Sequence, residues 1–264
     1  KGAGMIETIE RRLSKEPGRH IVQFYDAEPS LLVENVAGFI DEGLQYGDSI
    51  LVIATPVHSD AFLTALGKRR AAHDSRSRRL TFLDAQATLD QVLLDGKPDW
   101  RRFEQIIGGS VRALRRARPR SELRAYGEMV GILWAAGQLD AAVQLEKFWN
   151  VLLGNDDFML FCGYPIDVFA EEFDVAEVHD LLCAHTHVLP GGAASSMESA
   201  LDRAIREVMG EESKAVSRDV EGAIHPSWGA VSSAEATILW LRKHQTEFAT
   251  EILARARAYY IACA

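Results

Sequence analysis

The sequence predicts an α/β protein in which a three-layer, mainly parallel sheet is followed by a C-terminal helical appendage. Three observations lead to this fold class. Short β-rich runs alternate with helical patterns through the first two-thirds of the chain, as in βαβ units. One of these runs, at residues 49–55, is apolar on both faces, which is typical of a central parallel strand. After the small residues and breakers at 190–196, only helical patterns remain.

In the first half of the predicted sheet, proline and glycine residues mark where helices begin and end. Strands are expected at 20–25, 49–55 and 79–84. Pro29 begins a helix whose apolar residues recur at three- and four-residue spacing, and Gly43 and Gly47 are expected to end it. A second helix follows the central strand, at about 57–66.

The second half repeats the alternation. The third strand leads into helices near 86–94 and 100–116, and a fourth strand is expected at 122–126. Two more helices, a fifth strand and a closing helix complete the unit, at 128–136, 138–153, 158–163 and 175–185.

The domain boundary is expected near residue 190. This gives an α/β domain at 5–190 and a helical appendage at 191–264; residues 1–4 resemble a tag remnant and are set aside. The last helix is expected at 232–262, with Ser232 and Glu235 spaced as a capping box. Its apolar stripe could pack on the appendage's own first helix or form a dimer or partner interface; it comprises Ile238, Leu241, Phe248, Ile252, Ala256 and Tyr259.

Composition narrows the class of protein. The 264 residues are 47% hydrophobic with a net charge of -9, which suits a globular protein and disfavours direct binding to nucleic acid. The basic stretches at 68–79 and 112–124 are therefore expected to be solvated. No apolar run is long enough to span a membrane and no signal peptide is evident, so we expect a cytoplasmic protein. Three cysteines without CxxC spacing argue against disulfides and zinc knuckles.

The loop after the central strand lacks the residues that bind phosphate. It reads Ala-Thr-Pro-Val-His-Ser-Asp at 54–60, without the glycines and the lysine of a phosphate-binding loop. A triphosphate would lose its main electrostatic contacts there. We therefore expect neither ATP hydrolysis nor a bound cofactor.

Polar and aromatic residues gather at the expected carboxyl ends of the strands, where open α/β sheets bind ligands. They are Tyr25, Thr55, His58, Tyr126, Glu128 and Tyr164. Side chains with an aromatic face and a polar tip suit a pocket for a small organic molecule. The alternative is that they are ordinary polar residues at strand ends.

Other chemistry-bearing residues give weaker patterns. His58 and Glu128 could form an acid/base pair, but we expect them to orient a ligand and their substitution to change stability by less than about 1 kcal/mol. Cys162 is expected to be a small core residue. His179, His185 and His187 do not have the spacing of a compact metal site, so the sequence predicts no metal.

Several motifs together resemble the methanogen/methylotroph sensory (MEDS) domain family over about residues 18–190. They are His20-x-x-x-Phe24-Tyr25, Phe39-Ile-x-x-Gly43-Leu-x-x-Gly47-Asp, Leu51-Val-Ile-Ala-Thr-Pro56-x-His58, Phe82-Leu-Asp84-Ala, Arg124-x-Tyr126-Gly-Glu-Met-Val130, Leu133-Trp134, Leu145-Glu146-x-x-Trp149-Asn150 and Phe161-Cys-x-Tyr164-Pro165. The resemblance implies a RecA-like core with a degenerate phosphate loop. We expect His20 and Trp134, within these motifs, to join the ligand-binding residues.

The resemblance implies a signalling protein that senses a small, hydrocarbon-like molecule and regulates a partner, such as a kinase or transcriptional regulator, rather than an enzyme. We expect a homodimer that reports its state through the helical appendage, although no helix-turn-helix or kinase signature follows residue 190. The alternatives are a residual nucleotide-binding or ATPase-like protein on the same scaffold, and a ligand-free adaptor.

Overall fold

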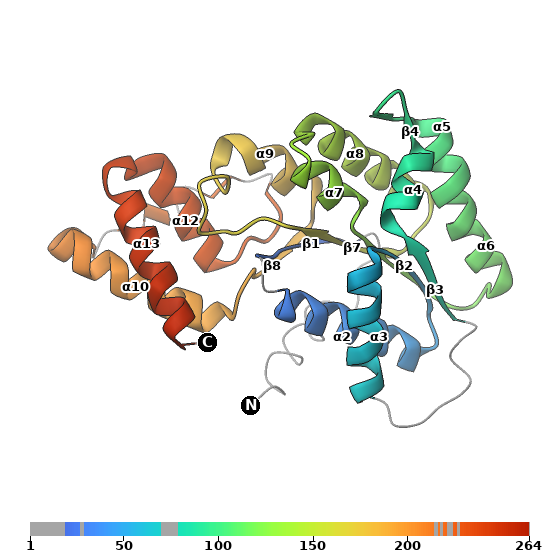
Figure 1. The fold of residues 1–264 in the computed structure, drawn as a ribbon, viewed down its shortest axis with the longest axis horizontal. Helices are drawn as coiled ribbons and strands as arrows, with labels where there is room; N and C mark the ends of the chain where they lie inside the picture. The colour runs from blue at the N-terminus through green and yellow to red at the C-terminus, as the bar shows by residue number, and fades with distance from the viewer. Residues whose placement is uncertain are drawn as a thin grey trace. The chain divides into compact units, whose positions relative to one another are not determined.

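The computed structural model describes residues 19–26, 29–69, 79–213, 216, 219–220, 224–225 and 228–263. Its strands form a six-stranded sheet in the order β3-β2-β6-β7-β1-β8, and a short hairpin is formed by β4 and β5. The pairs β2–β3, β2–β6, β6–β7 and β1–β8 are parallel. The predicted α/β class with a parallel sheet and C-terminal helices is confirmed (Figure 1).

The described residues form two compact units, one within residues 19–20 and 32–163 and one within residues 21–31 and 164–263. The sheet strands are β1 (His20–Phe24), β2 (Ser49–Ala54), β3 (Leu80–Asp84), β6 (Leu123–Gly127), β7 (Met159–Tyr164) and β8 (His187–Leu189). The first unit's helical segments are α2 (Ser30–Tyr46), α3 (Pro56–Arg69), α4 (Ala85–Val92), α5 (Trp100–Phe103), η1 (Glu104–Gly108), α6 (Gly109–Ala117), α7 (Met129–Ala135) and α8 (Leu139–Asn155). The second unit's helical segments include α9 (Val175–Ala184), α10 (Ala194–Met209), η2 (Gly210–Glu212), α12 (Ser233–His244) and α13 (Thr246–Cys263).

In the first unit, helices cover both faces of the sheet. Figure 1 shows α2 and α3 on one side of the strands and α7 and α8 on the other. All six residues of β2 are buried, as its continuous apolar run predicted. The layers are held together by aromatic contacts, such as Phe62 of α3 against Tyr126 of β6 with ring centroids 5.2 Å apart.

The end of α2 differs from the expectation in one respect. The helix runs through Gly43 and stops only before Gly47, whose φ of +87° favours glycine. A Cβ on Gly43 would lie 2.6 Å from Cδ1 of Ile50 and 2.7 Å from Cδ of Arg124. Gly43 therefore allows α2 to approach the sheet closely and does not terminate the helix.

Two short strand features were not expected from the sequence. Leu93–Leu94 and Lys97–Pro98 form β4 and β5, joined at Asp95 and Gly96, which both have positive φ. An Asp-Gly pair is a known hairpin signal, so this turn was predictable. The three-residue β8 is too short for periodicity to reveal.

The prediction of one terminal helix was wrong. The chain breaks at Gln245, with φ −127° and ψ 42°, and so forms α12 and α13. Both pack with α10 in the second unit, and four residues of the stripe are buried within the chain: Ile238, Leu241, Ile252 and Ala256. This burial favours the interpretation that the stripe packs on the appendage's own first helix.

The helices also bear on two other expectations. Within the described parts of the chain, no helix combines the length and the apolar character needed to cross a membrane. The first residues, including the supposed tag remnant at 1–4, and most of the basic stretch at 68–79 lie outside the described residues.

Candidate functional site

A group of polar side chains meets where β2 and β6 end. The strands β2 and β6 are neighbours in the sheet. From β2 the chain passes through α3 to β3 on one side, and from β6 it passes through α7 and α8 to β7 on the other side. Such a change of direction creates a topological switch point, and open α/β sheets bind ligands outside the carboxyl ends of the strands there. The local fold thus places Thr55 and Glu128 at the expected edge.

Glu128 is the centre of this group. Its carboxylate accepts hydrogen bonds from the backbone N–H of Thr55 and from the Tyr126 hydroxyl, each at 2.8 Å, and it pairs with Nδ1 of His58. Its backbone N–H donates to Ile53 at 3.0 Å, which fixes the loop after β6 to the end of β2. Glu128 is only 2% exposed, whereas His58 is 12% exposed.

The carboxylate also lies at the start of a helix. Thr55 precedes α3, Pro56 occupies its first position, and the Thr55 carbonyl accepts the first intrahelical bond from Ser59 at 2.8 Å. The positive end of the helix dipole stabilises a negative group at this place. Glu128 from the neighbouring strand therefore supplies an anion where a phosphate-binding loop would hold phosphate.

His58 is a partly exposed member of the group. Its ring stacks on Phe62 with centroids 5.8 Å apart and an interplanar angle of 28°, and Phe62 in turn contacts Tyr126. One face of the imidazole is thus held by the core while part of it reaches solvent. A partly exposed imidazole beside a buried carboxylate can form a hydrogen bond with a polar group of a small organic molecule.

The other expected site residues lie elsewhere. Trp134 is buried on α7, and His20 lies in a separate group with the buried Glu146 and Cys162 and with the exposed Asn150. Tyr25 and Tyr164 belong to the second unit, where the N–H of Tyr25 donates to the carbonyl of Tyr164 at 2.9 Å. Thr55, His58, Tyr126 and Glu128 are therefore the expected residues that the structure brings together.

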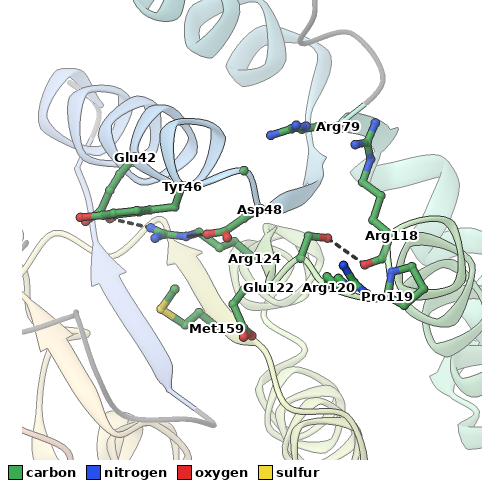
Figure 2. Close-up of a pocket in the computed structure, with 12 residues that line it drawn as sticks. Glu42, Tyr46, Asp48, Arg79, Arg118, Pro119, Arg120, Glu122, Arg124 and Met159 are labelled. Carbon is green, nitrogen blue, oxygen red and sulfur yellow. Dashed lines mark hydrogen bonds and ion pairs between the residues drawn. The ribbon is translucent and has the colours of Figure 1, made fainter.

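A cavity of about 900 Å³ lies at the opposite, amino edge of the same strands (Figure 2). Its lining includes Arg79, Arg118, Arg120 and Arg124 together with three carboxylates. Arg124 was expected to be solvated, but it is buried between Glu42 and Asp48. This arginine is therefore already paired with two carboxylates and serves the fold rather than an anionic ligand.

The burial of Glu128 changes the expected result of its substitution. Glu128→Gln should lower the free energy of unfolding by about 1–3 kcal/mol, because three donors point at the carboxylate and an amide offers only one acceptor oxygen. Denaturant unfolding measures this loss. Glu122→Gln, at an exposed glutamate near the start of β6, should stay within about 0.5 kcal/mol. Equal effects of the two variants would contradict the network.

Comparison with known families agrees with the motifs. Residues 19–186 match the family described as MEDS, the methanogen/methylotroph, DcmR sensory domain. The match covers more than half of the chain, so the protein belongs to this family of sensory domains. No curated protein sequence matches the chain closely enough to count as a relative.

Proposed function

We propose that this is a cytoplasmic signalling protein that binds a small, hydrocarbon-like molecule at the ends of β2 and β6 and regulates a partner protein through its C-terminal helices. The main support is the position of Glu128, a buried carboxylate with three donors at a topological switch point. The partly exposed His58 would contact the ligand, and Glu128 would hold the imidazole in place.

The same geometry argues against a nucleotide as the ligand. The carboxylate at the start of α3 would repel a phosphate at the place where an α/β fold normally binds one. The loop also lacks the lysine and glycines that would offset this repulsion. The RecA-like ancestry implied by the motifs is compatible with a scaffold that no longer binds ATP.

Signal transmission requires the ligand to prefer one of two states of the protein. A ligand with equal affinity for both would shift nothing, however tightly it binds. The helices α10, α12 and α13 form a packed group that follows the family domain, so they are the candidate output element. A homodimer would have to use surfaces other than the buried stripe residues.

The expected result with nucleotide is a small effect. Millimolar ATP with magnesium should raise the melting temperature by less than about 2 °C. A ligand whose concentration is near or below its dissociation constant adds less than roughly 0.5 kcal/mol to the free energy of unfolding. Differential scanning fluorimetry measures this directly. A large magnesium-dependent shift would instead support the residual nucleotide-binding alternative.

The sensory proposal is tested with one- to four-carbon alcohols and halogenated hydrocarbons in the same assay. At least one of these compounds should give a saturable shift in the parent protein that His58→Ala removes. Val57→Ala is the matched control, because Val57 is the preceding residue and is 76% exposed. A response that survives in His58→Ala would move the site elsewhere, and the absence of any response would favour the ligand-free adaptor.

A further inference from the structure

A second group of buried side chains, which shares no residue with the switch-point group, comes from other parts of the family motifs. His20 starts β1, Cys162 lies on β7, and Glu146 is on the inward face of α8. Nε2 of His20 lies 3.1 Å from Oε2 of Glu146 and 3.3 Å from Sγ of Cys162. The same glutamate oxygen is 3.9 Å from the sulfur. A nitrogen, an oxygen and a sulfur thus form a compact triangle inside the first unit.

Asn150 sets the orientation of the imidazole. It lies one helical turn after Glu146, and its Oδ1 is 3.0 Å from Nδ1 of His20. An amide oxygen can only accept, so Nδ1 is the donor and Nε2 faces Glu146 and Cys162. Histidines that bind metals are held in this way, with the second ring nitrogen donated to a neighbouring oxygen.

The spacing of the three atoms suits tetrahedral coordination. With bonds of about 2.0–2.1 Å to nitrogen and oxygen and about 2.3 Å to sulfur, two ligand atoms lie roughly 3.3–3.6 Å apart. The observed distances of 3.1, 3.3 and 3.9 Å lie on both sides of this range. Shifts of roughly 0.4 Å or less in each distance would therefore let one ion contact all three atoms.

We propose that His20, Glu146 and Cys162 bind a divalent transition-metal ion of the zinc class. Mixed nitrogen, oxygen and sulfur donors favour such an ion over magnesium or calcium, which prefer oxygen alone. A divalent ion would also balance a thiolate and a carboxylate that are both fully buried. Asn150 acts as a positioning residue for the imidazole.

An ion pair without metal is the competing explanation. A protonated His20 could donate to Glu146 and leave Cys162 as a neutral thiol. In the absence of a cation, burial and then the Glu146 carboxylate raise the pKa of this thiol well above its ordinary value. The two explanations differ in the role of the Cys162 sulfur, which is a ligand in the metal site but has no necessary part in the ion pair. The metal site does not depend on the proposed ligand site at Glu128.

The absorption spectrum of bound cobalt(II) shows directly whether a cysteine sulfur is one of its ligands. The full chain, purified without a histidine tag and treated with a chelator, should bind one equivalent of cobalt(II) with the visible absorption of a tetrahedral ion and a thiolate-to-metal charge-transfer band. Cys162→Ala should abolish that band, and Glu146→Gln and Asn150→Ala should each weaken binding by about ten-fold or more. Cys183→Ala is the control, because Cys183 is an exposed cysteine and its substitution should leave the spectrum unchanged.

A second measurement avoids the risk that a buried variant fails to fold. X-ray absorption of the zinc-loaded parent protein should show one sulfur at about 2.3 Å with nitrogen or oxygen neighbours. The absence of binding at equimolar metal, a metal without a sulfur ligand, or a charge-transfer band that Cys183→Ala removes would each overturn the proposal. Retained affinity in Glu146→Gln would remove that residue from the site and so refute the three-ligand set.

Discussion

Arg124→Met should be the most destabilising single substitution considered for this protein, with a loss of about 3–5 kcal/mol in the free energy of unfolding. Arg124 is buried on β6, and its Nε donates to Asp48 at 2.9 Å while Nη1 contacts Glu42 at 2.5 Å (Figure 2). Methionine keeps the apolar stem but leaves two carboxylates near the sheet without their cation. Urea unfolding followed by circular dichroism measures the loss.

Two comparisons separate the cost of leaving buried carboxylates unpaired from the cost of losing the packing contacts of Arg124. Arg206→Met removes an exposed arginine that is 4.0 Å from Asp202, and it should change stability by no more than about 0.5 kcal/mol. Adding Asp48→Asn and Glu42→Gln to Arg124→Met should recover part of the loss, because no unpaired charge then remains. A loss below about 1 kcal/mol in Arg124→Met would mean that water in the adjoining cavity already solvates both carboxylates.

Glu235→Gln should stabilise the protein at alkaline pH, on the order of 3 kcal/mol at pH 8, and much less at pH 5. Burial raises the pKa of Glu235 to about 7 from an ordinary 4.5. A raised carboxyl pKa means that the folded state holds the proton more tightly, so stability falls as pH rises from about 4.5 to about 7. Glutamine resembles the protonated form and avoids this loss.

The local contacts give the reason for the shift. Oε1 of Glu235 accepts from the N–H of Gly191 at 2.8 Å, but Oε2 has no hydrogen-bond partner among the described residues. Ser232 caps α12 through the N–H of Glu235, which is one half of the predicted capping box, whereas the Glu235 carboxylate binds the N–H of Gly191. Unfolding curves from pH 5 to 8 test the effect, with the exposed Glu251→Gln as control. Parallel pH profiles for the parent and Glu235→Gln would refute it.

Local sequence patterns were sufficient to predict most of the elements in the described part of the chain. The apolar run of β2, the helical spacing of α2 and the alternation of strands and helices all depend on neighbouring residues, and the structure confirms them. The missed features are short or depend on packing. The two-residue strands β4 and β5 and the break at Gln245 offer too few residues for a periodic signal.

The sequence by itself determined the α/β class, through the alternation of strand and helix patterns along the chain. It also determined the missing phosphate loop and the polar residues at strand ends, because each of these can be identified within a few consecutive residues. Only the tertiary structure decided which of those residues meet. His58 and Glu128 are 70 residues apart, and His20 and Cys162 are 142 apart. Their contacts depend on the strand order of the sheet, which no local pattern specifies. The sheet therefore brings a carboxylate to the start of α3 and a thiol to an imidazole.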